Sequence, residues 1–125
     1  MTHTNITNFN EGIDFVVDAV LEKIKPVVVL IAGSNRSLKG EFNLRVLTQL
    51  EKLGYKGGIR QADEDLRVEL NDVTLSFLLL DTYGSSATAD DYVRQKAGRV
   101  LDLRIYVGEM PNDDTQYDLI VPNFR

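Results

Sequence analysis

A continuous apolar run from Val27 to Ala32, preceded by Pro26 and followed by Gly33, restricts the fold more than any other feature of the sequence. Strands with one face in water alternate apolar and polar residues, whereas an unbroken run rich in β-branched residues is typical of a strand covered on both faces. Residues 73–80, which end in the apolar run Phe77 to Leu80, predict a second buried strand. The sequence therefore predicts a parallel sheet with both faces buried.

Apolar residues beside these strands recur every three or four positions, as they do on one face of a helix. The helical residues are Ile13, Val16, Val17, Val20, Leu21 and Ile24; Phe42, Val46, Leu50 and Leu53; and Val93, Ala97, Val100 and Leu101. Shorter patterns predict strands over residues 57–62, 103–107 and 117–121, with a helical turn or two over residues 64–70. This alternation predicts a three-layer α/β fold, a mostly parallel open sheet with helices on both faces.

The chain length and composition fit one domain. A chain of 125 residues that is 43% hydrophobic can bury a core without disulfides or metal. Residues 1–9 are polar and without period, which predicts a flexible lead-in, and Asn10 is the expected cap of the first helix. We therefore expect one α/β domain over residues 10–125.

The composition excludes several classes of function. Without cysteine, and with His3 as the one histidine, the chain has no thiolate nucleophile, zinc–thiolate site or Ser-His-Asp triad. A net charge of −5 argues against nucleic acid as a partner. No stretch approaches the ~20 apolar residues that span a bilayer, and the start lacks a secretory signal, so we expect a cytoplasmic protein without membrane contact.

The connection from Gly33 to Gly40 is the best candidate phosphate site. Such a site needs small residues whose N–H groups point inward, a helix N-terminus and a lysine. The P-loop pattern is glycine, four residues, then glycine, lysine and a serine or threonine. This connection keeps the first glycine and the lysine, but has Leu38 for the second glycine and Gly40 for the hydroxyl residue. The expected binding residues are Gly33, Ser34, Asn35, Arg36, Ser37, Lys39 and Gly40.

Together with the helix before it and the strand over residues 25–33, this connection resembles the opening of P-loop kinases of the uridine kinase type. The strands over residues 101–107 and 117–123 are similar in order and character to late strands of that family. The resemblance implies a P-loop NTPase-like fold and ATP or GTP as the ligand.

The same resemblance implies roles for three residues. Lys39 would hold the phosphates, Asp81 would lie near the metal, and Asp63 would approach an acceptor hydroxyl. Glycine at position 40 has no hydroxyl to ligate magnesium, and Leu38 restricts close approach of the backbone to a phosphate. The pattern therefore favours a degenerate P-loop that binds a nucleotide or another phosphate-bearing ligand over active phosphoryl transfer.

Two alternatives remain open. Gly33-Ser-Asn-Arg36 and the residues up to Asn43 are similar to the flavin-phosphate loop of flavodoxin-type NADPH-dependent reductases, and residues 83–86 are loosely similar to the second flavin loop of that family. A flavodoxin-like (Rossmann-like) flavin binder is therefore the second hypothesis. The third is a non-catalytic module that acts through a protein partner or as a homo-oligomer, with the Gly33 connection serving only as a turn.

Overall fold

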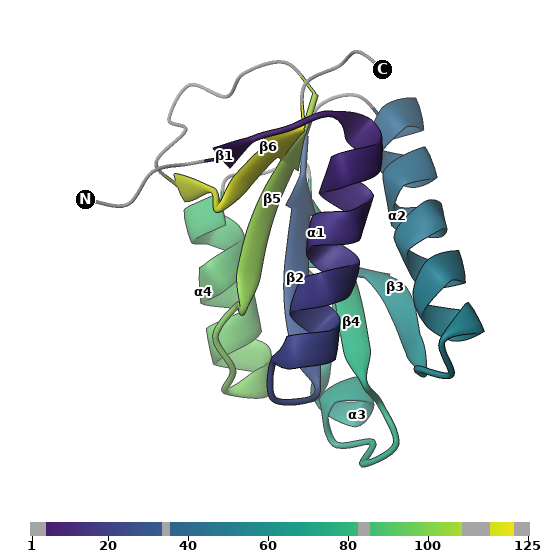
Figure 1. Cartoon of the computed structure of the whole chain (residues 1–125). Helices are drawn as coiled ribbons and strands as arrows, with labels where there is room; N and C mark the ends of the chain where they lie inside the picture. Colours follow the sequence, from purple (N-terminus) through teal and green to yellow (C-terminus); the bar gives the residue numbers. More distant parts are fainter. Residues whose placement is uncertain (1–4, 34–35, 83–85, 109–115, 122–125) are drawn as a thin grey trace.

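The computed structural model describes residues 5–33, 36–82, 86–108 and 116–121, which form one sheet with helices on both faces (Figure 1). Helices α1 and α2 cover one face, and α3 and α4 cover the other. In chain order the elements are β1 (Asn5–Ile6), α1 (Phe9–Glu22), β2 (Val27–Ala32), α2 (Arg36–Lys52), β3 (Gly57–Gln61), α3 (Arg67–Leu70), β4 (Phe77–Thr82), α4 (Ser86–Ala97), β5 (Leu103–Val107) and β6 (Leu119–Val121).

The six strands lie in the order β1-β6-β5-β2-β4-β3, and every neighbouring pair is parallel. Strand β2 is central, between β4 and β5, as its uninterrupted apolar run predicts. In the register with β4, Ile31 lies opposite Asp81 and Ala32 lies opposite Thr82. The predicted α/β fold with a parallel open sheet is confirmed.

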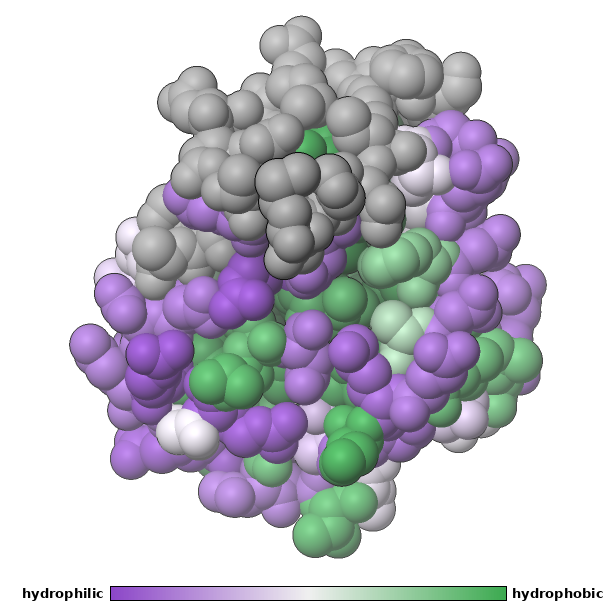
Figure 2. Space-filling model, turned by 60° about the vertical axis from the view of Figure 1, so that its left-hand side comes forward, coloured by the Kyte–Doolittle hydropathy of each residue, from purple (hydrophilic) through white to green (hydrophobic). Residues whose placement is uncertain are grey.

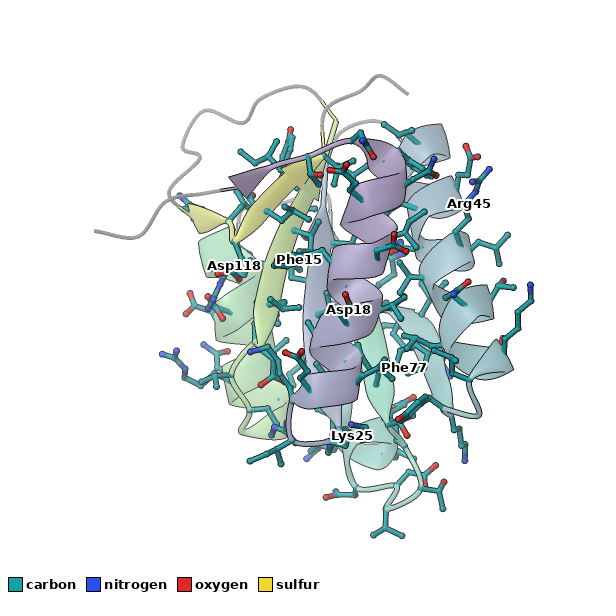
Figure 3. The ribbon with its side chains drawn as sticks, in the orientation of Figure 1. Phe15, Asp18, Lys25, Arg45, Phe77 and Asp118 are labelled. Atoms are coloured by element: carbon teal, nitrogen blue, oxygen red, sulfur yellow. The ribbon has the colours of Figure 1, made fainter. Side chains whose placement is uncertain are left out.

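Side chains of β2 point alternately to the two faces and so build two cores. Val27, Val29 and Ile31 pack toward α1 and α2, while Val28 and Leu30 pack toward α4 and the segment around α3. All five are fully buried. In Figure 3, Phe77 at the start of β4 lies on the α1 and α2 side of the sheet. Strand β2 therefore contributes to the cores on both faces of the sheet. This packing holds β2, and β4 beside it, in a fixed position, and so it also positions their carboxyl ends.

The start of the chain differs from the sequence prediction. Helix α1 begins at Phe9 and is capped by Asn8, whose Oδ1 accepts a hydrogen bond of 2.8 Å from the N–H of Glu11. Before it, β1 pairs with β6. The predicted lead-in over residues 1–9 and the cap at Asn10 are thus corrected from Asn5 onward. The helix begins earlier than predicted because Phe9 belongs to its buried face. The Phe9 ring packs edge-on against Phe42, with the ring centroids 5.6 Å apart.

None of the helices in the described part of the chain has the length and hydrophobicity that a membrane-spanning helix requires.

Candidate functional site

The turn after β2 begins with a glycine that no other residue can replace without strain. Gly33 has a φ of +145°, and a Cβ built there would lie 2.1 Å from the carbonyl oxygen of Val107, at the end of β5. The backbone of this turn is therefore pressed against the neighbouring strand. Ser34 and Asn35, two of the expected binding residues, lie outside the described residues.

Helix α2 begins at Arg36, four residues before Gly40, where the turn suggested by the sequence pattern ends. Residues 36–40 are helical because arginine, leucine and lysine are strong helix formers, and one glycine is tolerated. The expected cradle is therefore corrected over residues 36–40, since only the first four N–H groups of α2 lack partners within the helix. These groups and the helix dipole still favour an anion near residues 36–39.

The side chain of Lys39 is buried at the carboxyl ends of β2 and β4, and only 1% of the residue is exposed. Its Nζ donates hydrogen bonds to the carbonyl oxygens of Gly33, at 3.0 Å, and Thr82, at 2.8 Å. It also forms an ion pair of 2.8 Å with Oδ1 of Asp81. The ammonium group thus lies close to three oxygens, of which the two carbonyl oxygens accept its hydrogen bonds, and Lys39 links the ends of β2 and β4.

Asp81 is the negative partner of this link. It follows Leu80 in β4 and lies in register with Ile31 of β2, on the face that α2 covers. Its side chain is 15% exposed. Because both charges are largely removed from water, the loss of either partner alone would leave a buried, uncompensated charge, at a typical cost of ~3–5 kcal/mol.

Asp63 meets Asp81 at a cavity of about 230 Å³ near the carboxyl ends of β3 and β4. The cavity is lined by Gln61, Ala62, Asp63, Asp81, Thr82, Thr88 and Tyr92. Of the three residues expected from the resemblance, Asp63 and Asp81 therefore share one cavity, and Lys39 contacts Asp81 directly. Pockets that hold whole drug-sized ligands have ~300–1,000 Å³, so this cavity suits only a part of such a ligand.

Lys96 of α4 contacts two of the residues that line this cavity, Asp63 and Tyr92. Its Nζ donates a 2.9 Å hydrogen bond to the carbonyl oxygen of Asp63 and lies 5.6 Å from the centroid of the Tyr92 ring. These contacts join α4 to the segment that follows β3, so the position of Asp63 depends on α4 as well as on its own segment.

Thr88, Tyr92 and Gln61 are cavity residues that the sequence reading did not select. Thr88 and Tyr92 lie in α4, and Gln61 ends β3. The order of the elements could have identified these residues. The helix that follows β4 starts at the carboxyl end of that strand, and because β3 is parallel to β4, the segment that follows β3 lies next to it.

Position 40, where the P-loop pattern has a magnesium-binding hydroxyl, is occupied by glycine. A Cβ at Gly40 would have no atom within 4 Å, so this exposed position offers no group toward the site. Across the described ranges, no group of three or more histidine, aspartate or glutamate residues could hold a metal ion. Arg99, in the connection before β5, donates a hydrogen bond of 2.8 Å to the carbonyl oxygen of Pro26, at the opposite end of β2.

Comparison of the chain with family models, curated proteins and solved structures gave no match.

Proposed function

We propose that this domain binds a phosphate-bearing ligand, a nucleotide in the first instance, at the start of α2, and that it does so without phosphoryl transfer. Lys39 supplies the positive charge, and the first-turn N–H groups of α2 supply hydrogen-bond donors.

The observation that carries this proposal is the position of the Lys39 ammonium. It lies 3.0 Å from the carbonyl oxygen of Gly33, at the turn that leads into α2. A lysine at the junction of a parallel strand and a helix N-terminus combines the two features that bind phosphates in α/β proteins. In P-loop NTPases the lysine contacts the phosphates and an aspartate from a second element holds the magnesium ion; here an aspartate from a second element, Asp81 of β4, lies 2.8 Å from Lys39.

The absence of transfer follows from position 40. Phosphoryl transfer in P-loop proteins uses a serine or threonine hydroxyl after the lysine to hold magnesium. Gly40 has no side chain, so the metal would lose this ligand. We expect binding of ATP or GTP that changes little when magnesium is added, and no release of ADP or GDP.

Calorimetric titration of ATP, GTP and inorganic pyrophosphate, with and without magnesium, tests the proposal. The variant Lys39→Met combined with Asp81→Asn removes both charges while keeping the side-chain volumes, so that neither is left unpaired. We expect this variant to lose binding. Lys52→Met, at the exposed far end of α2, is the matched control and should bind as wild type does. No binding by wild type, or equal binding by the double variant, would refute the proposal.

The strand order does not favour the flavin alternative. When β2 is counted as the first strand, the order is second, third, first, fourth, fifth, whereas flavodoxin-like sheets have the order second, first, third, fourth, fifth. Flavin in those proteins lies between the first and third strands, at the point where the order reverses. Here the reversal lies between β2 and β5, because the third strand in this count, β4, stays on the β3 side.

One observation favours a second candidate, the non-catalytic interaction module. Ile24, Val68, Val73 and Val100 are 91%, 82%, 98% and 58% exposed. Three of them lie in the connections that enter β2, β4 and β5, and Val68 lies in α3, so they belong to the amino-terminal end of the sheet. Figure 2 shows hydrophobic side chains at the surface of its lower end. Light scattering of wild type and of Ile24→Ser with Val73→Ser tests whether this end mediates self-association.

A further inference from the structure

The buried contact of Lys39 with Asp81 opposes the binding of an anion to Lys39. The ammonium group already faces the Asp81 carboxylate at 2.8 Å and two carbonyl oxygens at 3.0 Å and 2.8 Å. A phosphate oxygen can approach Nζ only if at least one of these oxygens gives way. The backbone carbonyls of Gly33 and Thr82 are fixed by the ends of β2 and β4, whereas the Asp81 side chain can rotate.

We infer that Asp81 is an autoinhibitory residue, an internal anion that holds Lys39 away from phosphate until a ligand displaces it. This inference rests on the proposed function, and it assigns Asp81 a role opposite to that of a residue that assists binding through a metal. The charge balance supports it: the pair has no net charge, so the ligand-free site attracts anions less than an unpaired lysine would.

Asp81 lies beside a cavity that can accommodate its side chain after displacement. Asp81 lines the cavity that it shares with Asp63, and no side-chain partner of Asp81 other than Lys39 is present among the described residues. Rotation toward the cavity would expose the carboxylate to solvent while Nζ keeps its two carbonyl contacts. The ligand thus replaces one oxygen neighbour of Lys39, and the link between β2 and β4 through the carbonyls persists.

The test uses inorganic pyrophosphate in EDTA, so that no divalent cation contributes. We expect Asp81→Asn to bind pyrophosphate roughly tenfold more tightly than wild type, because the fraction of Lys39 available to the anion rises. Asp81→Glu keeps the negative charge and should bind no more tightly than wild type. Lys39→Met with Asp81→Asn should not bind.

The outcomes separate this inference from the proposed function. If wild type binds pyrophosphate and Asp81→Asn binds equally or more weakly, the autoinhibitory role is refuted while phosphate binding stands. If neither binds, both are refuted. Since Asp81→Asn leaves Lys39 without its counter-charge and could unfold, a second measurement uses wild type. The ¹³Cγ resonance of Asp81 should shift with pyrophosphate and saturate with binding, and an unchanged resonance at saturation would also refute the displacement.

Discussion

Two buried residues near the candidate site, Gly33 and Asn43, have opposite effects on the stability of the folded chain. Gly33 cannot accept a larger side chain, since its φ is positive and a Cβ would meet the Val107 carbonyl at 2.1 Å. Asn43, one turn after Lys39 in α2, is 3% exposed, and its Oδ1 has no hydrogen-bond partner among the described residues. Gly33 is therefore required for the conformation of the turn, whereas Asn43 lowers the stability of the folded state because its buried oxygen is unpaired within the described part of the chain.

Gly33→Ala should lower the free energy of unfolding by about 1–3 kcal/mol, through backbone strain and the forced separation of β2 from β5. Gly40→Ala is the matched control. It lies inside α2, where a Cβ meets no atom within 4 Å, so it should raise stability by about 0.5–1 kcal/mol. Urea unfolding measures both values. Equal effects of the two substitutions would show that the close contact at Gly33 is absent.

Asn43→Leu should raise the free energy of unfolding by about 1 kcal/mol, because it removes a buried acceptor that has no donor and keeps a similar shape. The same substitution at exposed Gln49 should change stability by less than ~0.5 kcal/mol. Thermal and urea unfolding provide the comparison. A less stable Asn43→Leu protein would mean that Oδ1 has a donor, such as a bound water.

Sequence reasoning selected Lys39 and Asp81 but not their contact. Spacing after Gly33 identified the lysine, and the end of an apolar strand identified the aspartate. Their 2.8 Å separation depends on β4 lying beside β2 rather than at the sheet edge, and strand order is a long-range property that local patterns do not encode. The burial of Lys39 was equally unpredictable, since the pattern alone suggested a lysine in an open loop.

The short helix α3 lies between two aspartates whose ionisation is tied to close partners. A hydrogen bond from the Arg67 side chain lowers the pKa of Asp65 from 3.8 to about 2. For Asp72, the Thr74 hydroxyl and then the Lys56 ammonium lower the pKa from 3.8 to about 2. A lowered pKa stabilises the folded state above pH ~4, and this contribution is lost as the pH falls from about 4 to about 2.

Arg67→Gln should therefore raise the pKa of Asp65 toward its ordinary value and leave that of Asp72 low, which makes Asp72 an internal control. NMR titration of the two carboxyl carbons measures both values. The wild-type protein should lose stability between pH 4 and pH 2, and the variant should lose less. If the pKa of Asp65 is the same in both proteins, the hydrogen bond does not form in solution.

Strand β3 is an edge of the sheet, and Arg60 covers part of it. Its Nη1 donates a hydrogen bond of 2.8 Å to the carbonyl oxygen of Ile59, and a Cβ at Gly58 would lie 3.3 Å from Nη1. A charged side chain along an edge strand hinders pairing with another chain. We expect Arg60→Ala to self-associate at concentrations where wild type and the exposed α4 control Arg94→Ala do not. Sedimentation velocity decides this, and identical profiles would contradict it.

The sequence predicted which segments form helices and strands more accurately than it predicted the residues at which they begin. The apolar run of β2 and the stripe of α2 were clear, because each buries a continuous surface. Strand β1 was missed because its two residues are ordered by pairing with β6, at the other end of the chain. The early start of α2 was missed because the glycine-rich pattern was taken as a single turn.

At the scale of the whole molecule, the parallel sheet separates polar from apolar features. The carboxyl ends of β2, β3 and β4 hold Lys39, Asp81 and the Asp63 cavity, whereas the amino-terminal end carries the most exposed aliphatic residues, Ile24, Val68 and Val73. Figure 3 shows Lys25 at that amino-terminal end, where its Nζ donates a hydrogen bond of 2.9 Å to the carbonyl oxygen of Val20 in α1. Ligand binding and any protein contact are thus assigned to opposite ends, and each can be altered without the other.

A crystal structure of the protein with inorganic pyrophosphate tests the central claim most directly. We predict an anion at the first turn of α2, in contact with Lys39 Nζ, with Asp81 rotated toward the cavity that it shares with Asp63. If Lys39 instead keeps its ion pair with Asp81 at pyrophosphate concentrations that saturate binding in solution, with the anion bound elsewhere, Lys39 is a structural link between β2 and β4 and the proposed phosphate site is wrong.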